Sequence, residues 1–194
     1  METKAAASPT ANEIVFYYQK KIIKVNVKTH QAFILKQAEL IEGLNCSAPK
    51  FSFDGKYIAY MDSYTWEIPT KLWVMHADGG NDRCIVDNIG TQNKVKNFLW
   101  HPSENKIYFI YGYAYGAMDK GGSIKVINPE NLKSEMLVTT ESPYLIEKFD
   151  IKRDTFILTI MEIYDGPPGI IRHTKTIPIP KDSELITLNV ENLK

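Results

Sequence analysis

The chain has 194 residues, which is enough for one domain with a core of its own. Its 23 lysines and arginines balance 23 aspartates and glutamates, so the formal net charge is zero and no global field favours nucleic acid or an anionic membrane. No run of about 18 apolar residues is present. We therefore expect no nucleic-acid partner and no transmembrane segment.

The first residues of the chain, METKAAASPTAN, lack the apolar stretch of a secretory signal. Their alanine, serine, threonine and proline content suits a flexible leader, which we place at residues 1–12, before a single domain at residues 13–194. Two explanations of this leader stay open. Either a signal or lipoprotein segment preceded residue 1, or the N-terminus is naturally ragged.

A repeat begins with an aromatic residue at positions 51, 100 and 149, which are 49 residues apart each time. In each copy an apolar run, a turn and a second apolar run follow one another, which predicts a hairpin. The turns are centred on Asp54-Gly55, Ser103-Glu104 and Lys152-Arg153.

A second set of alternating segments follows these hairpins, at residues 21–29, 71–79, 123–131 and 184–192. We interpret them as third strands, because each alternates apolar and polar residues and then meets a turn. Short fourth strands follow in three copies, at residues 31–35, 82–87 and 134–139. The unit is then four antiparallel strands, here named A to D in chain order.

A repeat of 40 to 50 residues with four strands is typical of a β-propeller blade. We therefore predict an all-β, β-propeller-like array of about four four-stranded antiparallel blades, either a small closed propeller or an open partial one. A β-sandwich with coincidental spacing is the alternative. The predicted blades cover residues 13–43, 44–90, 91–141 and 142–194.

Residues 49–86, with PKFSFDGKYIAYMDS and then KLWVMHADGGNDRCIV, resemble the WD-like β-propeller repeat of TolB-type proteins. The second copy keeps Trp100, Pro102 and Ser103, and the third keeps little beyond Phe149. Phe53 stands where this family usually has proline. The resemblance implies a propeller fold and an extracytoplasmic location, which would be periplasmic, secreted or lipid-anchored.

The two ends of the repeat look incomplete, since the first copy begins at strand B with residues 13–18 and the last ends soon after strand C. An open array would expose apolar blade faces, so we expect a homodimer if the ring does not close. Cys46 and Cys84 fall near opposite faces of their blade, beyond the reach of a disulfide. We expect two unpaired thiols, with Cys84 a small buried hydrophobe.

The connections between strands B and C are long in three copies, at residues 62–70, 111–122 and 163–183. They should gather on one face of the array, where aromatic residues with a few charges suit contact with a protein, peptide or carbohydrate. For any one tyrosine, packing against the blades is the alternative. The candidate binding residues are Tyr64, Trp66, Tyr111, Tyr113, Tyr115, Asp119, Tyr164, Asp165, Arg172 and His173.

The leading interpretation is a non-catalytic binding module without a cofactor, because no nucleophile elbow, phosphate-binding loop or zinc motif is present. A calcium site at residues 78–82 is disfavoured, since the segment lacks the bidentate glutamate of an EF-hand and occupies a hairpin turn. One alternative is a small propeller glycoside hydrolase that uses loop carboxylates such as Glu67, Asp119 and Asp165. The other is a structural half-propeller that dimerises.

Overall fold

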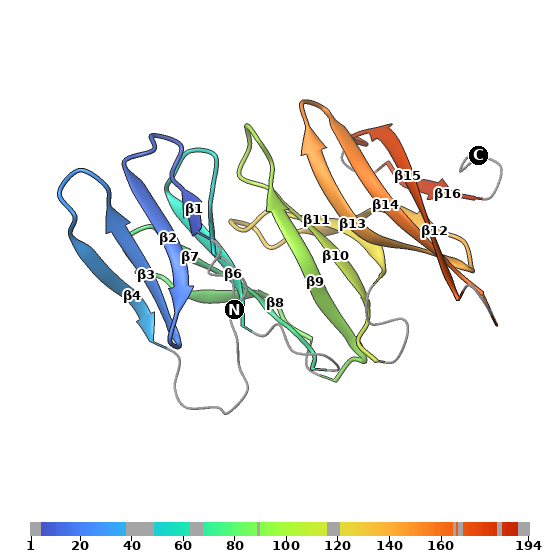
Figure 1. Ribbon diagram of the computed structural model, residues 1–194, viewed down its shortest axis with the longest axis horizontal. Coiled ribbons are helices and arrows are strands. Elements are labelled where there is room, and N and C mark those ends of the chain that lie inside the picture. Colours follow the sequence, from blue (N-terminus) through green and yellow to red (C-terminus); the bar gives the residue numbers. More distant parts are fainter. Residues whose placement is uncertain are drawn as a thin grey trace.

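The computed structural model is built from β-strands in four sheets, with no helix in the part of the chain that it describes (Figure 1). The prediction of an all-β fold is therefore confirmed. The structure describes residues 5–37, 49–62, 68–88, 90–115, 121–164, 166, 169–181 and 184–189.

The first sheet has the order β1-β2-β3-β4 and is antiparallel throughout. Its strands are β1 (Ala5–Ala7), β2 (Glu13–Tyr18), β3 (Lys21–Asn26) and β4 (Ala32–Gln37).

The N-terminal segment differs from the expected flexible leader, because Ala5–Ala7 pair with β2 as strand A of the first blade. A hairpin joins the two strands. The Ser8 amide donates to the Glu13 carbonyl at 2.8 Å, and the Glu13 amide donates to the Ser8 hydroxyl at 3.1 Å. The alanine, serine, threonine and proline content suggested a flexible leader, but cross-strand pairing with β2 gives this segment a regular strand.

The second sheet, β5-β6-β7-β8, shows the predicted four-stranded blade. Gly55 takes the left-handed conformation, with φ of 73°, in the predicted turn between β5 and β6, and Gly79 does so, with φ of 92°, between β7 and β8. A residue without Cβ adopts such angles at no steric cost. The strands are β5 (Lys50–Phe51), β6 (Tyr57–Met61), β7 (Leu72–His76) and β8 (Arg83–Val86).

The third sheet contains the predicted four strands and one more, in the order β16-β12-β11-β10-β9. The fifth strand, β16, pairs in parallel with β12, with Val138 opposite Ile186 and Thr140 opposite Leu188. The strands are β9 (Asn93–Trp100), β10 (Ile107–Tyr113), β11 (Ser123–Ile127), β12 (Ser134–Thr140) and β16 (Ile186–Leu188).

The fourth sheet has three strands, β13 (Tyr144–Lys152), β14 (Thr155–Ile163) and β15 (Ile170–Pro178). Two predictions are wrong here. Residues 170–178, assigned to a long loop, pair with β14 over nine positions as strand C. The segment at 184–192, assigned to strand C, instead provides β16 of the third sheet. The prolines around residues 167–180 suggested a loop, but Pro178 lies at the end of a strand on the sheet edge, where a missing N–H is tolerated.

The sheets pack face to face, and three apolar cores lie between successive pairs of them. The three aromatic residues of the repeat occupy one core each: Phe51 between the first and second sheets, Trp100 between the second and third, and Phe149 between the third and fourth. Such packing is needed because a single blade cannot bury both of its faces. The spacing of 49 residues therefore marks equivalent positions in successive blades.

The array is open. Figure 1 shows the sheets following one another along the molecule, with the first sheet in blue at one end and the fourth in orange and red at the other. Each sheet contacts the next one through its first strand. Strand β1 contacts β5, β5 contacts β9, and β13 contacts the third sheet. The fold is thus a partial, open β-propeller-like array. Of the two predicted forms, a small closed propeller and an open partial one, the structure has the second.

Cys84 is a free thiol at the edge of the second sheet and is half-buried rather than fully buried. Cys46 lies outside the described residues. Across those residues, no helix has the length and apolar character needed to span a membrane.

Candidate functional site

The B–C connections of the second, third and fourth sheets leave the array on the same side as the D–A connections, because all of them join the same ends of antiparallel strands. We call this side the loop face. Several of its predicted binding residues, namely Tyr64, Trp66, Asp119 and Asp165, lie outside the described residues, as does the alternative catalytic residue Glu67. The described part of the face consists of the strand ends that carry these loops.

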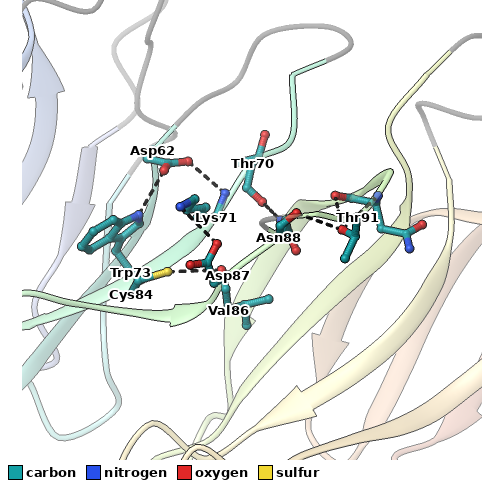
Figure 2. Close-up of polar contacts among 10 residues, drawn as sticks. Asp62, Thr70, Lys71, Trp73, Cys84, Val86, Asp87, Asn88 and Thr91 are labelled. Atoms are coloured by element: carbon teal, nitrogen blue, oxygen red, sulfur yellow. Dashed lines mark hydrogen bonds and ion pairs between the residues drawn. The ribbon is translucent and has the colours of Figure 1, made fainter.

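Asp62 closes the base of the first long loop, between β6 and β7 (Figure 2). Its carboxylate accepts hydrogen bonds from the Lys71 amide at 2.9 Å and from the indole N–H of Trp73 at 3.1 Å. The Asp62 amide in turn donates to the Lys71 carbonyl at 3.3 Å. These contacts fix the two ends of the loop relative to each other.

The same region connects β7 to the segment after β8 (Figure 2). Lys71 Nζ lies 3.1 Å from Asp87 Oδ1, and the hydrogen bond raises the pKa of the lysine. The buried Asn88 side chain donates to the Thr70 carbonyl, and the Thr91 hydroxyl donates to the Asn88 carbonyl at 3.1 Å. The base of the loop is therefore held by polar contacts on both of its sides.

Cys84 lies below this network and donates its S–H to the Val86 carbonyl at 3.4 Å (Figure 2). Burial raises the pKa of the thiol, and the negative charge of Asp87 raises it further. A thiol with a raised pKa is mostly protonated at neutral pH and reacts slowly as a nucleophile. The geometry gives Cys84 a packing role.

The predicted tyrosines of the third sheet lie at the end of β10. Tyr111 packs against the core between the second and third sheets, with Lys125 Nζ 4.5 Å from the centre of its ring. Tyr113 is 38% exposed, and its ring meets that of Tyr115 edge-on, with ring centres 5.4 Å apart. Tyr113 and Tyr115 thus form an aromatic pair at the loop face, whereas Tyr111 packs between the sheets.

A second group surrounds Glu162, near the end of β14. Its carboxylate accepts hydrogen bonds from the Tyr144 hydroxyl at 3.0 Å and from Tyr164, and lies 2.9 Å from His173 Nε2. The hydrogen bonds from Tyr164 and His173 hold the pKa of Glu162 below its usual value. The same carboxylate raises the pKa of Tyr164 to about 12 and also raises that of Tyr144, which burial raises first. We call Tyr144, Glu162, Tyr164 and His173 the Glu162 cluster.

The elements of the fourth sheet bring this cluster together from three places in the sequence. Tyr144 begins β13, Glu162 is near the end of β14, and His173 is near the beginning of β15. Tyr144 and Glu162 are directly paired across the sheet, and the Tyr144 ring meets the His173 ring edge-on at 6.2 Å. Strand pairing therefore places Tyr144, Glu162 and His173 at one end of the sheet, and Tyr164 follows directly after β14.

Arg172 and His173 were predicted on a loop, but both belong to β15. Arg172 makes two hydrogen bonds with Glu147, from Nε at 2.6 Å and from a terminal nitrogen at 2.9 Å. The pairing raises the pKa of Arg172. Its neighbour His173 points to the opposite side of the strand, because successive side chains alternate.

Three glycines connect the third and fourth sheets at the loop face. Gly122 and Ile146 exchange two backbone hydrogen bonds of 3.1 Å each, outside the regular strands. A Cβ atom at Gly121 would lie 2.6 Å from side-chain atoms of Leu145 and Met161, and one at Gly112 would lie 2.5 Å from the Gly121 carbonyl oxygen. The contact between the two sheets therefore leaves room only for glycine at Gly121, whereas Gly112 is crowded by the backbone of the third sheet itself.

The structure thus divides the predicted site residues into separate groups. Tyr164 and His173 meet in the Glu162 cluster, while Tyr113 and Tyr115 pair at the neighbouring sheet and Arg172 is bound to Glu147. Sequence reasoning missed Tyr144, Glu147 and Glu162. The sequence did contain a sign that Glu162 is special, because it is the one charged residue in the otherwise largely apolar run TFILTIMEIY.

Two open hollows lie on the opposite side of the array, near the A–B and C–D turns. One, of about 520 Å³, is lined by Lys24, Lys56, Tyr57, His76, Ala77 and Asp78. The other, of about 330 Å³, is lined by Ala7, Pro9, Phe51, Ser52, Phe53, Trp100, His101 and Pro102. Neither contains a predicted site residue. The described residues also include no group of His, Cys, Asp or Glu arranged to hold a metal ion.

No family model and no curated protein matches the chain. Solved structures are similar to it. TolB from Acinetobacter baumannii aligns with a TM-score of 0.62 and 15% identity, over 91% of this chain and 40% of that one. A protein described as a conserved lipoprotein from Clostridium novyi NT aligns with a TM-score of 0.61 and 17% identity, over 74% of this chain and 92% of that one.

The β-propeller domain of the Trilobed protease from Pyrococcus furiosus, reported to have an open velcro topology, aligns with a TM-score of 0.56 and 12% identity. The alignment covers 92% of this chain and 54% of that one. At these identities the similarity is one of fold. The chain therefore has a TolB-like β-propeller fold in partial form, and it spans about half or less of the TolB and protease structures.

Proposed function

We propose that this chain is a non-catalytic interaction module that contacts a protein, a peptide or a glycan through its loop face. The observation that carries the proposal is the exposure of two tyrosines there: Tyr113 is 38% exposed and Tyr164 is 40% exposed. Tyrosine offers both an apolar ring and a hydroxyl, which suits recognition surfaces.

The contacts around these tyrosines support the proposal. The Tyr113 ring is braced by Tyr115, and the Tyr164 hydroxyl bonds to Glu162. Both aromatic side chains are therefore held in place before a partner arrives, which reduces the entropy lost on binding. The hydrogen bonds that Asp62 accepts likewise fix the base of the loop between β6 and β7, which belongs to the same face.

We also propose an extracytoplasmic location. The similarity to a protein described as a lipoprotein supports this location, together with the resemblance of residues 49–86 to the TolB-type repeat. Fractionation of the cells that produce the protein tests it. Recovery of the protein with the cytoplasmic fraction alone would contradict the location without affecting the loop-face proposal.

The binding function can be tested on glycan and peptide arrays with the purified chain. We expect Tyr113→Ala and Tyr164→Ala to weaken the signals that the wild type gives, since each removes an exposed ring. Phe53→Ala is the matched control, because Phe53 is also 38% exposed but lies in the turn between β5 and β6 on the opposite side. Equal signals from wild type and both tyrosine variants would refute the proposed face.

A further inference from the structure

Two carboxylates of the fourth sheet are largely buried, but they have different partners. The side chain of Glu147 is 10% exposed and accepts two hydrogen bonds from the Arg172 guanidinium. The side chain of Glu162 is 13% exposed, and its donors are two tyrosine hydroxyls and a histidine ring. Among the described residues, no lysine or arginine forms an ion pair with Glu162. Its negative charge therefore lacks the permanently charged partner that Glu147 has.

The donors around Glu162 keep it ionised without cancelling its charge. Hydrogen bonds from Tyr164 and His173 hold the pKa of Glu162 below its usual value, so the carboxylate is charged at neutral pH. A tyrosine hydroxyl is a neutral donor, and a histidine ring has no fixed charge near neutral pH, unlike a guanidinium. Because largely buried charges are normally paired, this site favours the approach of a positive charge.

Aromatic rings line the approach to this carboxylate. The Tyr144 ring is buried and meets the His173 ring edge-on, with ring centres 6.2 Å apart. On the side toward solvent, the Tyr164 hydroxyl binds the carboxylate while 40% of the residue stays exposed. The Tyr164 amide donates to the Gly169 carbonyl at 2.9 Å, which holds this residue at the start of its loop. A cation that reaches Glu162 therefore also meets tyrosine rings, which attract cations through their π-electrons.

We infer that the Glu162 cluster binds a lysine or arginine side chain of a protein or peptide partner. The inference rests on the loop-face function proposed above and narrows its ligands, since a neutral glycan brings no positive charge. A divalent metal is disfavoured, because the described part of the cluster offers one carboxylate and one histidine, which are too few ligands. The side chain of the partner would thus do for Glu162 what Arg172 does for Glu147.

An array of short peptides tests the inference. Each peptide contains one lysine or arginine, and a matched copy has norleucine in that position. At low salt we expect the wild type to give signals at least about fivefold stronger on the basic peptides than on their copies, because only the basic peptides combine charge pairing with cation–π contact. The ratio should fall as salt is added, since ions screen a partly exposed pair.

Glu162→Gln should bring this ratio close to one and leave the signals on the norleucine copies unchanged, because the amide keeps the shape of the side chain but has no charge. Far-UV circular dichroism checks that the variant is folded. Glu147→Gln is the matched control, since it removes the same charge from the same sheet at a carboxylate that Arg172 already occupies. Its ratio should stay within about twofold of the wild-type value.

A wild-type ratio near one at low salt would overturn the inference without any variant, as would an unchanged ratio in Glu162→Gln. If Glu147→Gln lowers the ratio as much as Glu162→Gln does, the preference is a long-range effect of charge and the assignment to the Glu162 cluster is wrong. A ratio near one together with signals that Tyr164→Ala weakens would leave the loop-face function standing and refute the cation site alone. If no peptide gives a signal above background, peptide recognition by this face is refuted and the inference falls with it.

Discussion

Gly122 and Ile146 exchange two backbone hydrogen bonds that join the third and fourth sheets at the loop face. Gly122 also lies close to β10 of its own sheet: a Cβ atom there would be 2.4 Å from the Tyr111 carbonyl oxygen and 3.0 Å from the Gly112 Cα. These neighbouring atoms belong to the backbone, so they cannot move away by a change of rotamer as side-chain atoms can. A side chain at this position would push Gly122 away from β10 and so disturb its two hydrogen bonds to Ile146.

Gly122→Ala should lower the free energy of unfolding by about 1–3 kcal/mol, the usual cost of forcing an extra methyl group into a packed site. Urea denaturation measures the change. Gly80→Ala is the control, because there the nearest atom is a carboxylate oxygen of Asp78, at 3.1 Å, which belongs to a side chain in a surface turn. A loss at Gly122 no greater than that at Gly80 would contradict the steric argument.

The Glu162 cluster should make stability depend on pH. The folded state lowers the pKa of Glu162 from its usual value of 4.5, so the carboxylate stabilises the folded protein at pH values above 4.5. This contribution is lost as the pH falls through the lower, folded-state pKa, where Glu162 becomes protonated.

We therefore expect Glu162→Gln to be less stable than the wild type at pH 7, with the difference shrinking as the pH falls below 4.5. Urea denaturation at a series of pH values measures it. Glu130→Gln, in the surface turn between β11 and β12, provides a control without this cluster of donors. A difference that stays constant from pH 7 to below 4.5 would refute the assignment to Glu162.

Asp62 is predicted to fix the base of the first long loop. Asp62→Ala removes the acceptor for both the Lys71 amide and the Trp73 indole, so it should cost about 1–3 kcal/mol of unfolding free energy. Asp62→Asn keeps the shape and one acceptor oxygen, so its cost should be intermediate. Chemical denaturation compares the three proteins, and an asparagine variant as unstable as the alanine variant would argue against hydrogen bonding as the cause.

The repeat could be predicted from sequence because equivalent residues have equivalent surroundings. Phe51, Trp100 and Phe149 each enter the core next to their own blade, and Ile58, Ile107 and Phe156 do the same. Local signals also sufficed for the hairpin turns: Gly55 and Arg153 both have positive φ, as tight turns require.

The remaining features depend on contacts between distant parts of the chain. The pairing of β16 with β12 joins residues about 48 positions apart, so alternation in the sequence could indicate a strand there but not its partner. The strand at Ile170–Pro178 is exposed along its edge, and its polar residues between prolines looked like a loop. In the site, Tyr144 and Glu162 pair only because β13 and β14 align in one register, which the sequence does not specify by itself.

The parallel strand β16 should contribute strongly to stability through Leu188. This side chain is 2% exposed and belongs to the core between the third and fourth sheets, so β16 ties the end of the chain to both. Leu188→Ala should lower the free energy of unfolding by about 2–5 kcal/mol, as expected for a buried leucine. Leu185→Ala is a matched control, because Leu185 lies just before the same strand and is 54% exposed. Its effect should stay within about 0.5 kcal/mol. Similar losses in the two variants, measured by urea denaturation, would mean that β16 does not anchor the chain through its buried face.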